Sequence, residues 1–187
     1  MDRKSFSILV LVLLCTCFIG CLNYHRNSFG GDRPKKPRFR LAKPEPYQLK
    51  AEDQIDTTAI YIHKYPDLLD KTKECQMILR FFGNGRFSYI YNDKNYNNLK
   101  GHDIGYYRVK NNNIVLMETF IVSTNGLGSK GIGSYSRSVG IIKNDTLIDI
   151  LTSDISEIEW QDNKIKNKIN YVYLKQKVDT LIGTPDW

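Results

Sequence analysis

Cysteine is scarce in this chain of 187 residues, and its distribution excludes two kinds of site. Three of the four cysteines lie within the first 21 residues, so Cys75 stands alone in the remainder. A lone cysteine forms no internal disulfide, and no cysteine cluster has the spacing of a zinc site. Cys75 begins an apolar run, so we interpret it as a small buried residue rather than a catalytic thiol.

Histidine is also rare, and recognisable catalytic motifs are missing. None of the three histidines has metal-ligand spacing to another. His102 precedes Asp103 and could act as a base, but no motif marks a serine or cysteine nucleophile. The glycine-rich segment 125–133 lacks the spacing of a phosphate-binding P-loop, so we interpret it as a surface loop. The sequence favours a non-enzymatic protein without cofactor or metal.

Long apolar runs are absent except at the N-terminus. Arg3 and Lys4 precede an apolar stretch from Phe6 to Leu14. A basic start followed by about 7–15 apolar residues is typical of an export signal. A membrane-spanning helix needs about 20 such residues. The pattern predicts an export signal over residues 1–20, with an uncleaved anchor helix or an ordinary signal cut nearby as alternatives.

The end of this segment resembles the lipobox of bacterial lipoproteins. Its residues Phe18-Ile19-Gly20-Cys21 place a small residue directly before a cysteine. The resemblance implies cleavage before Cys21, attachment of diacylglycerol to its thiol, with fatty-acid chains such as palmitate, and anchoring in the cell envelope. In that family, Leu22 rather than Asp after the cysteine implies sorting to the outer membrane.

Most of the chain has no excess of charge of either sign, although the formal net charge of the whole chain is +7. Residues 51–187 hold seventeen basic and seventeen acidic side chains, whereas residues 21–50 hold eight basic and two acidic ones with four prolines. The basic character therefore belongs to the segment 21–50 and does not indicate a nucleic-acid-binding domain. We expect this segment to be a disordered, lipidated linker that lets the domain stand off the membrane. Its charges either attract anionic headgroups or only keep it extended.

Beyond residue 51 the sequence has little helix signal. Short runs rich in Ile, Val, Tyr and Phe alternate with clusters of Asn, Asp and Gly, a pattern typical of strands and turns. The runs predict eight strands at 57–64, 76–82, 86–92, 104–110, 113–122, 133–142, 146–152 and 169–176.

Sharp turn signals separate these strands, as at Gly83-Asn84-Gly85. The sequence therefore predicts an all-β domain over 51–187, an antiparallel meander closed into a barrel or half-barrel. One or two helical turns are expected to begin at Pro66. Residues 154–168 fit either a bent strand pair or a short helix.

Alternation along the predicted strands sorts side chains by face. Two otherwise apolar rows each carry a charge, Glu118 and Arg137, and a buried charge is costly unless it is paired. One hypothesis places both inside the barrel, where they help to hold a ligand; in the alternatives they face water or form a structural pair. The many tyrosines suit a ligand cavity or ordinary strand packing. The candidate ligand-binding residues are Tyr89, Tyr91, Tyr107, Glu118, Phe120, Tyr135 and Arg137.

The strands and turns of segments 79–86, 105–109, 118–120 and 140–147 resemble those of small lipocalin-like lipoproteins of Gram-negative bacteria. The resemblance lies in this order and not in a sequence signature. It implies a non-enzymatic barrel that binds a small apolar or amphipathic ligand. The expected partners are membrane lipid through the acylated Cys21 and that ligand, with no nucleic acid.

Two other functions stay open. One is an envelope interaction or structural protein whose filled barrel binds another protein. The other is a hydrolase, which would require His63 or His102 to lie beside a serine and a carboxylate.

Overall fold

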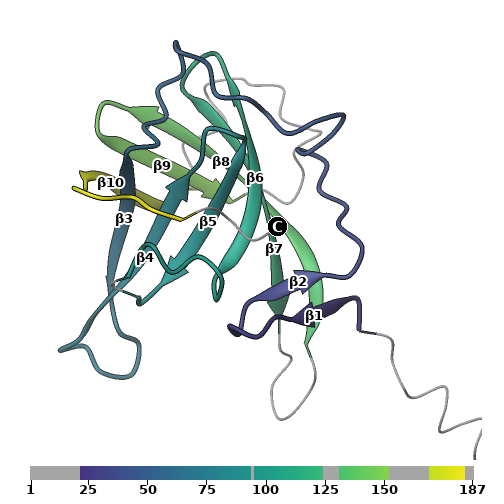
Figure 1. The fold of residues 1–187 in the computed structure, drawn as a ribbon. Helices are drawn as coiled ribbons and strands as arrows, with labels where there is room; N and C mark the ends of the chain where they lie inside the picture. The colour runs from purple at the N-terminus through teal and green to yellow at the C-terminus, as the bar shows by residue number, and fades with distance from the viewer. Residues whose placement is uncertain (1–21, 94, 124–130, 152–168, 184–187) are drawn as a thin grey trace, which may run out of the picture.

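The computed structural model describes residues 22–93, 95–123, 131–151 and 169–183. Within these ranges the chain forms strands and no helix, so none of the described residues forms a helix able to cross a membrane. Eight strands form one closed antiparallel barrel in the order β10-β3-β4-β5-β6-β7-β8-β9 (Figure 1). Their bounds are β3 (Ala59–Pro66), β4 (Glu74–Phe81), β5 (Arg86–Tyr91), β6 (Asp103–Lys110), β7 (Ile114–Ser123), β8 (Ile132–Lys143), β9 (Thr146–Leu151) and β10 (Ile169–Lys177). The barrel closes because β10 pairs with both β3 and β9.

The predicted antiparallel barrel is confirmed, and each barrel strand begins and ends within two residues of its predicted range. The turns explain this agreement. Gly85 has a φ of 75°, and Asn111, Asn112 and Asn144 have φ values of 50°, 65° and 53°. Glycine and asparagine tolerate this left-handed region better than other residues, so they mark where one strand must reverse into the next.

The two ends of the barrel differ. Because neighbouring strands are antiparallel, the connections that follow β3, β5, β7 and β9 share one end, which we call the loop end. The connections after β4, β6 and β8 share the opposite end, called the turn end. The described connections at the loop end, 67–73 and 92–102, are longer than the tight turns at 82–85, 111–113 and 144–145.

The helix expected from Pro66 is wrong, because residues 67–73 form a loop. Backbone N–H groups of Leu69 and Asp70 donate to Oδ1 of Asp67 at 2.7 and 3.0 Å. Such local bonds to an aspartate offer the backbone an alternative to a helix. The segments 154–168 and 125–130 lie outside the described residues, so their predictions stay untested.

Aromatic rings fill the barrel interior toward the turn end. Tyr61, Phe81, Phe87 and Tyr107 are at most 1% exposed, and neighbouring rings among them lie 5.1–5.8 Å apart between centroids. Ile55, Tyr47 and Leu49, from the chain that precedes β3, pack against the same cluster. These four rings fill the interior between the middle of the barrel and its turn end, and we call them the aromatic floor.

Residues 22–50 pack on the barrel, which corrects the expectation of a disordered linker. β1 (Tyr24–Arg26) and β2 (Asp32–Pro34) form a small hairpin beside the barrel (Figure 1). Farther along, Phe39 and Leu41 are only 3% and 9% exposed.

Both side chains rest on an apolar outer face of the wall. Phe39 packs against Ile104 and Phe120, and Leu41 packs against Leu116 and Val139. The segment has few apolar residues, but these few meet a face of the barrel that would otherwise be exposed. Burial there offsets the entropy lost on ordering the chain.

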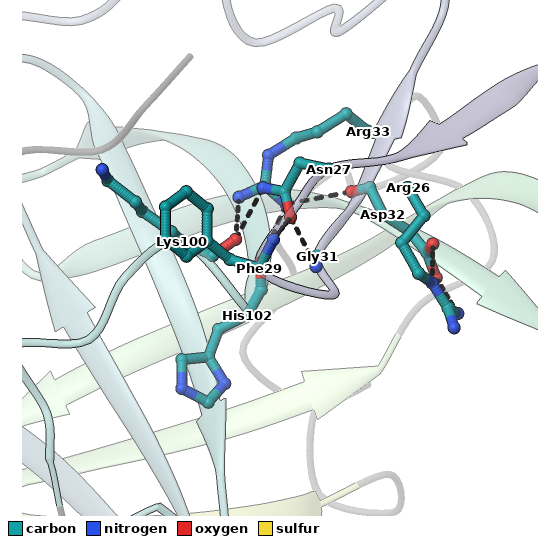
Figure 2. Close-up of polar contacts among 8 residues, drawn as sticks. All are labelled: Arg26, Asn27, Phe29, Gly31, Asp32, Arg33, Lys100 and His102. Carbon is teal, nitrogen blue, oxygen red and sulfur yellow. Dashed lines mark hydrogen bonds and ion pairs between the residues drawn. The ribbon is translucent and has the colours of Figure 1, made fainter.

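The turn of the β1–β2 hairpin is fixed to the loop end (Figure 2). The buried Arg33 donates from Nη2 to the carbonyl oxygen of Lys100 at 2.9 Å and from Nη1 to that of His102 at 3.0 Å. Asn27 donates to the Lys100 oxygen at 2.8 Å, while its own Oδ1 accepts the N–H of Gly31. The hairpin therefore holds the connection between β5 and β6.

If residues 22–50 belong to the fold, shortening Phe39 must destabilise the whole protein. Phe39→Ala removes a buried ring and is expected to cost about 3–5 kcal/mol. Its exposed neighbour gives a control, because Arg40→Ala should change stability by less than about 0.5 kcal/mol. Denaturant unfolding of both variants checks this, and equal stabilities would indicate a solvated linker.

Candidate functional site

The seven predicted ligand-binding residues divide between the two sides of the barrel wall. Tyr89 and Tyr107 belong to the interior cluster, which draws on all eight strands, and Tyr91 shares their face of the wall. Phe120 and Tyr135 pack outside, against Phe39. The structure therefore does not bring the predicted set together in one cavity.

Glu118 and Arg137 meet, but on the outer wall and not in the interior. They are opposite residues on β7 and β8, with Arg137 Nε 3.1 Å from Glu118 Oε1. The backbone N–H of Leu41 donates to the other oxygen, Glu118 Oε2, at 3.0 Å. Glu118 is fully buried, so the pair joins the wall to the N-terminal segment. This geometry favours the structural interpretation of the two charges.

The interior holds a polar cluster that the sequence analysis missed, formed by Tyr89, Ser138, Asp149 and Tyr173. All four are at most 9% exposed. The Tyr89 hydroxyl donates to Asp149 Oδ2 at 3.5 Å, which is long for a hydrogen bond. By hydrogen-bond geometry, Asp149 Oδ1 and the Tyr173 hydroxyl are buried without a partner among the described residues, although the rise that burial causes in the pKa of Tyr173 is opposed by the nearby Tyr89 hydroxyl. Buried polar atoms are normally satisfied, so these two call for a ligand or bound water.

The electrostatics of the cluster follow from its burial. Burial raises the pKa of Asp149 from 3.8 to about 6, although hydrogen bonds with Ser138 and Tyr89 oppose the shift. Burial, and then the charge of Asp149, raise the pKa of Tyr173. Asp149 is therefore largely ionised at neutral pH beside a neutral phenol. Its Oδ1 is a strong acceptor to which no donor is bonded among the described residues.

Aromatic rings line the interior wall between this cluster and the loop end. His63 contacts the rings of Tyr65 and Tyr171, and Tyr91 stacks on Tyr89. Tyr91 and Tyr171 are 43% and 38% exposed, so this part of the wall reaches solvent. The loop end is thus the side from which the described wall is accessible.

At the same end, the pairing of β3 with β10 stops before β3 does. The last backbone pair toward the loop end is Ile62 with Leu174, although β3 continues to Pro66. Beyond that pair, His63 Nδ1 lies 2.9 Å from the carbonyl oxygen of Val172. A side chain therefore takes the place of the backbone ladder there.

The histidines and the free cysteine have other partners. His102 Nε2 lies 3.3 Å from Asp93 Oδ2, and in the described part of the chain neither His63 nor His102 bonds to a serine or cysteine side chain. The Cys75 thiol lies 3.4 Å from Asp67 Oδ2, and its pKa is raised by burial and by that carboxylate. Among the described residues no group of three metal-ligating side chains occurs.

One sequence signal for the missed cluster was present. The run Thr146-Leu147-Ile148-Asp149-Ile150-Leu151 places one carboxylate among apolar residues on a strand. Alternation puts Asp149 on the face of Leu147, which is buried in the interior cluster. Tyr89 lies on β5, which does not pair with β9, and Tyr173 lies on β10, which pairs with β9 but is separated from it in sequence by the segment 152–168. No local pattern points to either residue.

No known protein family, curated protein or solved structure matches this chain.

The buried carboxylate predicts a pH-dependent stability. The folded-state pKa of Asp149 is above its unfolded value, so its ionisation costs stability as pH rises from about 4 to about 6, and the full cost persists above that. Asp149→Asn removes this cost. As pH rises from about 4 to about 8, the free energy of unfolding of the variant should increase relative to that of the parent by on the order of 2–3 kcal/mol.

Unfolding free energies measured across this pH range check the sign. Asp179→Asn is the control, because Asp179 is exposed and its replacement should show no such gain. An Asp149→Asn profile parallel to that of the parent would contradict the buried, ionised carboxylate.

Proposed function

We propose that this protein is a non-enzymatic lipoprotein of the bacterial envelope that binds a small amphipathic ligand inside its barrel. The ligand's polar group hydrogen-bonds to Asp149 and Tyr173, and its apolar part lies among aromatic and methionine side chains. The observation that carries the proposal is the buried pair Asp149 Oδ1 and Tyr173 hydroxyl in the barrel interior, for which the described part of the chain supplies no partner at hydrogen-bond geometry.

The chemistry of the pair defines the polar end of the ligand. An ionised carboxylate accepts hydrogen bonds only, while a phenol hydroxyl can donate or accept. A hydroxyl or amino group on the ligand would donate to Asp149 Oδ1 and could pair with the Tyr173 hydroxyl. A hydrogen bond from the ligand to each buried polar atom removes a desolvation cost of about 1–3 kcal/mol. These bonds would both strengthen binding of the ligand and fix its orientation.

The apolar part has matching surroundings. Met77 and Met117 are buried in the same interior cluster, together with the rings of the aromatic floor. Methionine adapts its shape to irregular apolar groups, and tyrosine offers an apolar wall with a polar end. Barrels of eight strands have room for a filled core or for one small ligand.

The proposed location rests on the N-terminal sequence. The lipobox-like residues before Leu22 support acylation of Cys21 and a lipid anchor in the envelope, with sorting to the outer membrane. The packing of residues 22–50 adds that such an anchor would attach directly beside the barrel, because the first described residues already contact β8.

A second candidate is an envelope protein whose filled barrel only presents a surface to a partner. The dense aromatic floor favours it, since four rings there are almost fully buried. Both candidates have the same fold and anchor. They differ in whether the central polar cluster holds a ligand.

Native mass spectrometry separates these candidates. The whole chain is exported in a Gram-negative host and released in mild detergent without denaturant, because residues 22–50 are part of the fold. We expect extra mass that is lost on unfolding. Asp149→Leu and Tyr173→Phe should each lose most of that mass, since each removes one of the unpartnered polar atoms.

The matched control is Tyr106→Phe, which removes a hydroxyl from the outer wall and should retain the ligand. Retained mass that is indifferent to both interior substitutions would place the ligand elsewhere. A bare protein in every preparation would favour the interaction protein.

A further inference from the structure

We infer that the loop end of the barrel is a membrane-docking surface, in which Leu68 and Leu69 enter the bilayer and a cationic groove binds anionic phospholipid headgroups. This inference rests on the part of the proposed function that tethers the chain through its N-terminus. It does not depend on a ligand in the barrel.

Exposed apolar side chains gather at the loop end from separate parts of the chain. Leu68 and Leu69, at the tip of the β3–β4 loop, are 94% and 98% exposed. Phe29 on the hairpin turn is 57% exposed, and Ile132 at the start of β8 is 66% exposed. Clustered exposed apolar groups on a folded protein mark an interaction surface.

The turn end has the opposite composition. Its turns present Asn84, Asn111, Asn112, Asn144 and Asp145. The barrel is thus amphipathic along its axis, because its turn end is polar and its loop end carries exposed apolar side chains. A bilayer surface, which is a flat boundary between water and an apolar phase, fits this division, because the exposed apolar side chains come from separate parts of the chain.

The β3–β4 loop is built to hold its two leucines outward. Asp67 and Asp70 accept backbone N–H bonds from within the loop, and Lys73 lies 3.1 Å from Asp70. The polar groups of the loop are thereby satisfied internally. Leu68 and Leu69 have no such role and no cover, so bilayer entry would remove their apolar area from water.

A cationic groove lies at the same end, where the described chain begins. It has a volume of about 530 Å³ and is lined by Leu22, Asn23, Pro34, Lys35, Lys36, Arg38, Phe120, Gly133 and Tyr135. Three basic side chains and no acidic one line it. The β3–β4 loop has balanced charge, so attraction to anionic lipid would come from this groove.

The N-terminal attachment fixes which end meets the membrane. Asn23 pairs with the backbone of Gly133 through two hydrogen bonds, of 2.6 and 3.1 Å, at the start of β8. Each residue of chain spans at most about 3.6 Å. The described chain therefore begins at Leu22, next to the start of β8 at the loop end, and an anchor at the adjacent Cys21 would lie within a few ångströms of that point.

Tryptophan quenching in vesicles tests the docking. The full chain is reconstituted in vesicles of phosphatidylcholine and phosphatidylglycerol whose acyl chains are brominated at a defined depth. Leu68→Trp adds emission to that of the parent chain. This added emission should shift to the blue and be lost to lipids brominated near the headgroup.

Lys143→Trp is the matched control, because Lys143 is exposed at the turn end, and its emission should remain unquenched. Equal quenching at both positions, or none at residue 68 in protein that floats with the vesicles, would overturn the docking and leave the lipid anchor intact. A chain that fails to float contradicts both the anchor and the docking.

The headgroup contact has its own test. Lys35→Glu with Lys36→Glu should reduce the quenching at residue 68 in vesicles that contain phosphatidylglycerol. The control pair Lys110→Glu and Lys143→Glu makes the same charge change at the turn end and should leave it unchanged. If both double variants lose the quenching at residue 68 to the same extent, the net charge of the protein, and not this groove, binds the lipid.

Discussion

A single buried carboxylate, that of Glu118, joins the barrel wall to the chain that precedes it. Its two oxygens have different partners, Arg137 on the neighbouring strand and the backbone N–H of Leu41. A fully buried charge is tolerated only when it is paired with an opposite charge and its remaining polar atoms are hydrogen-bonded. Removal of one partner typically costs about 3–5 kcal/mol of stability. The N-terminal segment is therefore a component of the fold. It covers the outer faces of β6 to β8, and its hairpin holds the connection at the loop end.

This attachment decides how the protein would sit in the envelope. A flexible linker would leave an anchored barrel free to rotate at a distance from the membrane, whereas the packed segment would bring the proposed anchor point next to the barrel. The end proposed to face the bilayer is also the end at which the interior rings reach solvent. An amphipathic ligand moving between bilayer and barrel would pass those rings before its polar group meets Asp149. In this account, orientation and binding are consequences of one packing arrangement.

The sequence predicted the strands well because turns are local. Positive φ values at Gly85 and Asn144 restrict those positions to a few residue types, so hairpins can be recognised from neighbouring residues alone. The inward faces could not be assigned in the same way. Residues Val115 to Phe120 are all buried, because β7 has the core on one face and the N-terminal segment on the other. A strand covered on both faces loses its alternation, so the sequence left open whether Glu118 lies inside the barrel, faces water or forms a structural pair.

The N-terminal segment and the polar cluster were missed for different reasons. Phe39 and Leu41 alternate with basic residues, and this short strand-like pattern was outweighed by the prolines and charges around it. The cluster around Asp149 is complete only when the barrel has formed, because its other members come from β5, β8 and β10.

Hydrogen exchange at the Leu41 amide tests the central claim most directly. This N–H donates to a buried oxygen of Glu118 in a segment whose composition resembles a linker. We predict strong protection in the native protein, comparable to that of the barrel strands, and its loss in Glu118→Ala. Exchange of the Leu41 amide in the native protein at the rate of an unstructured chain would contradict the account.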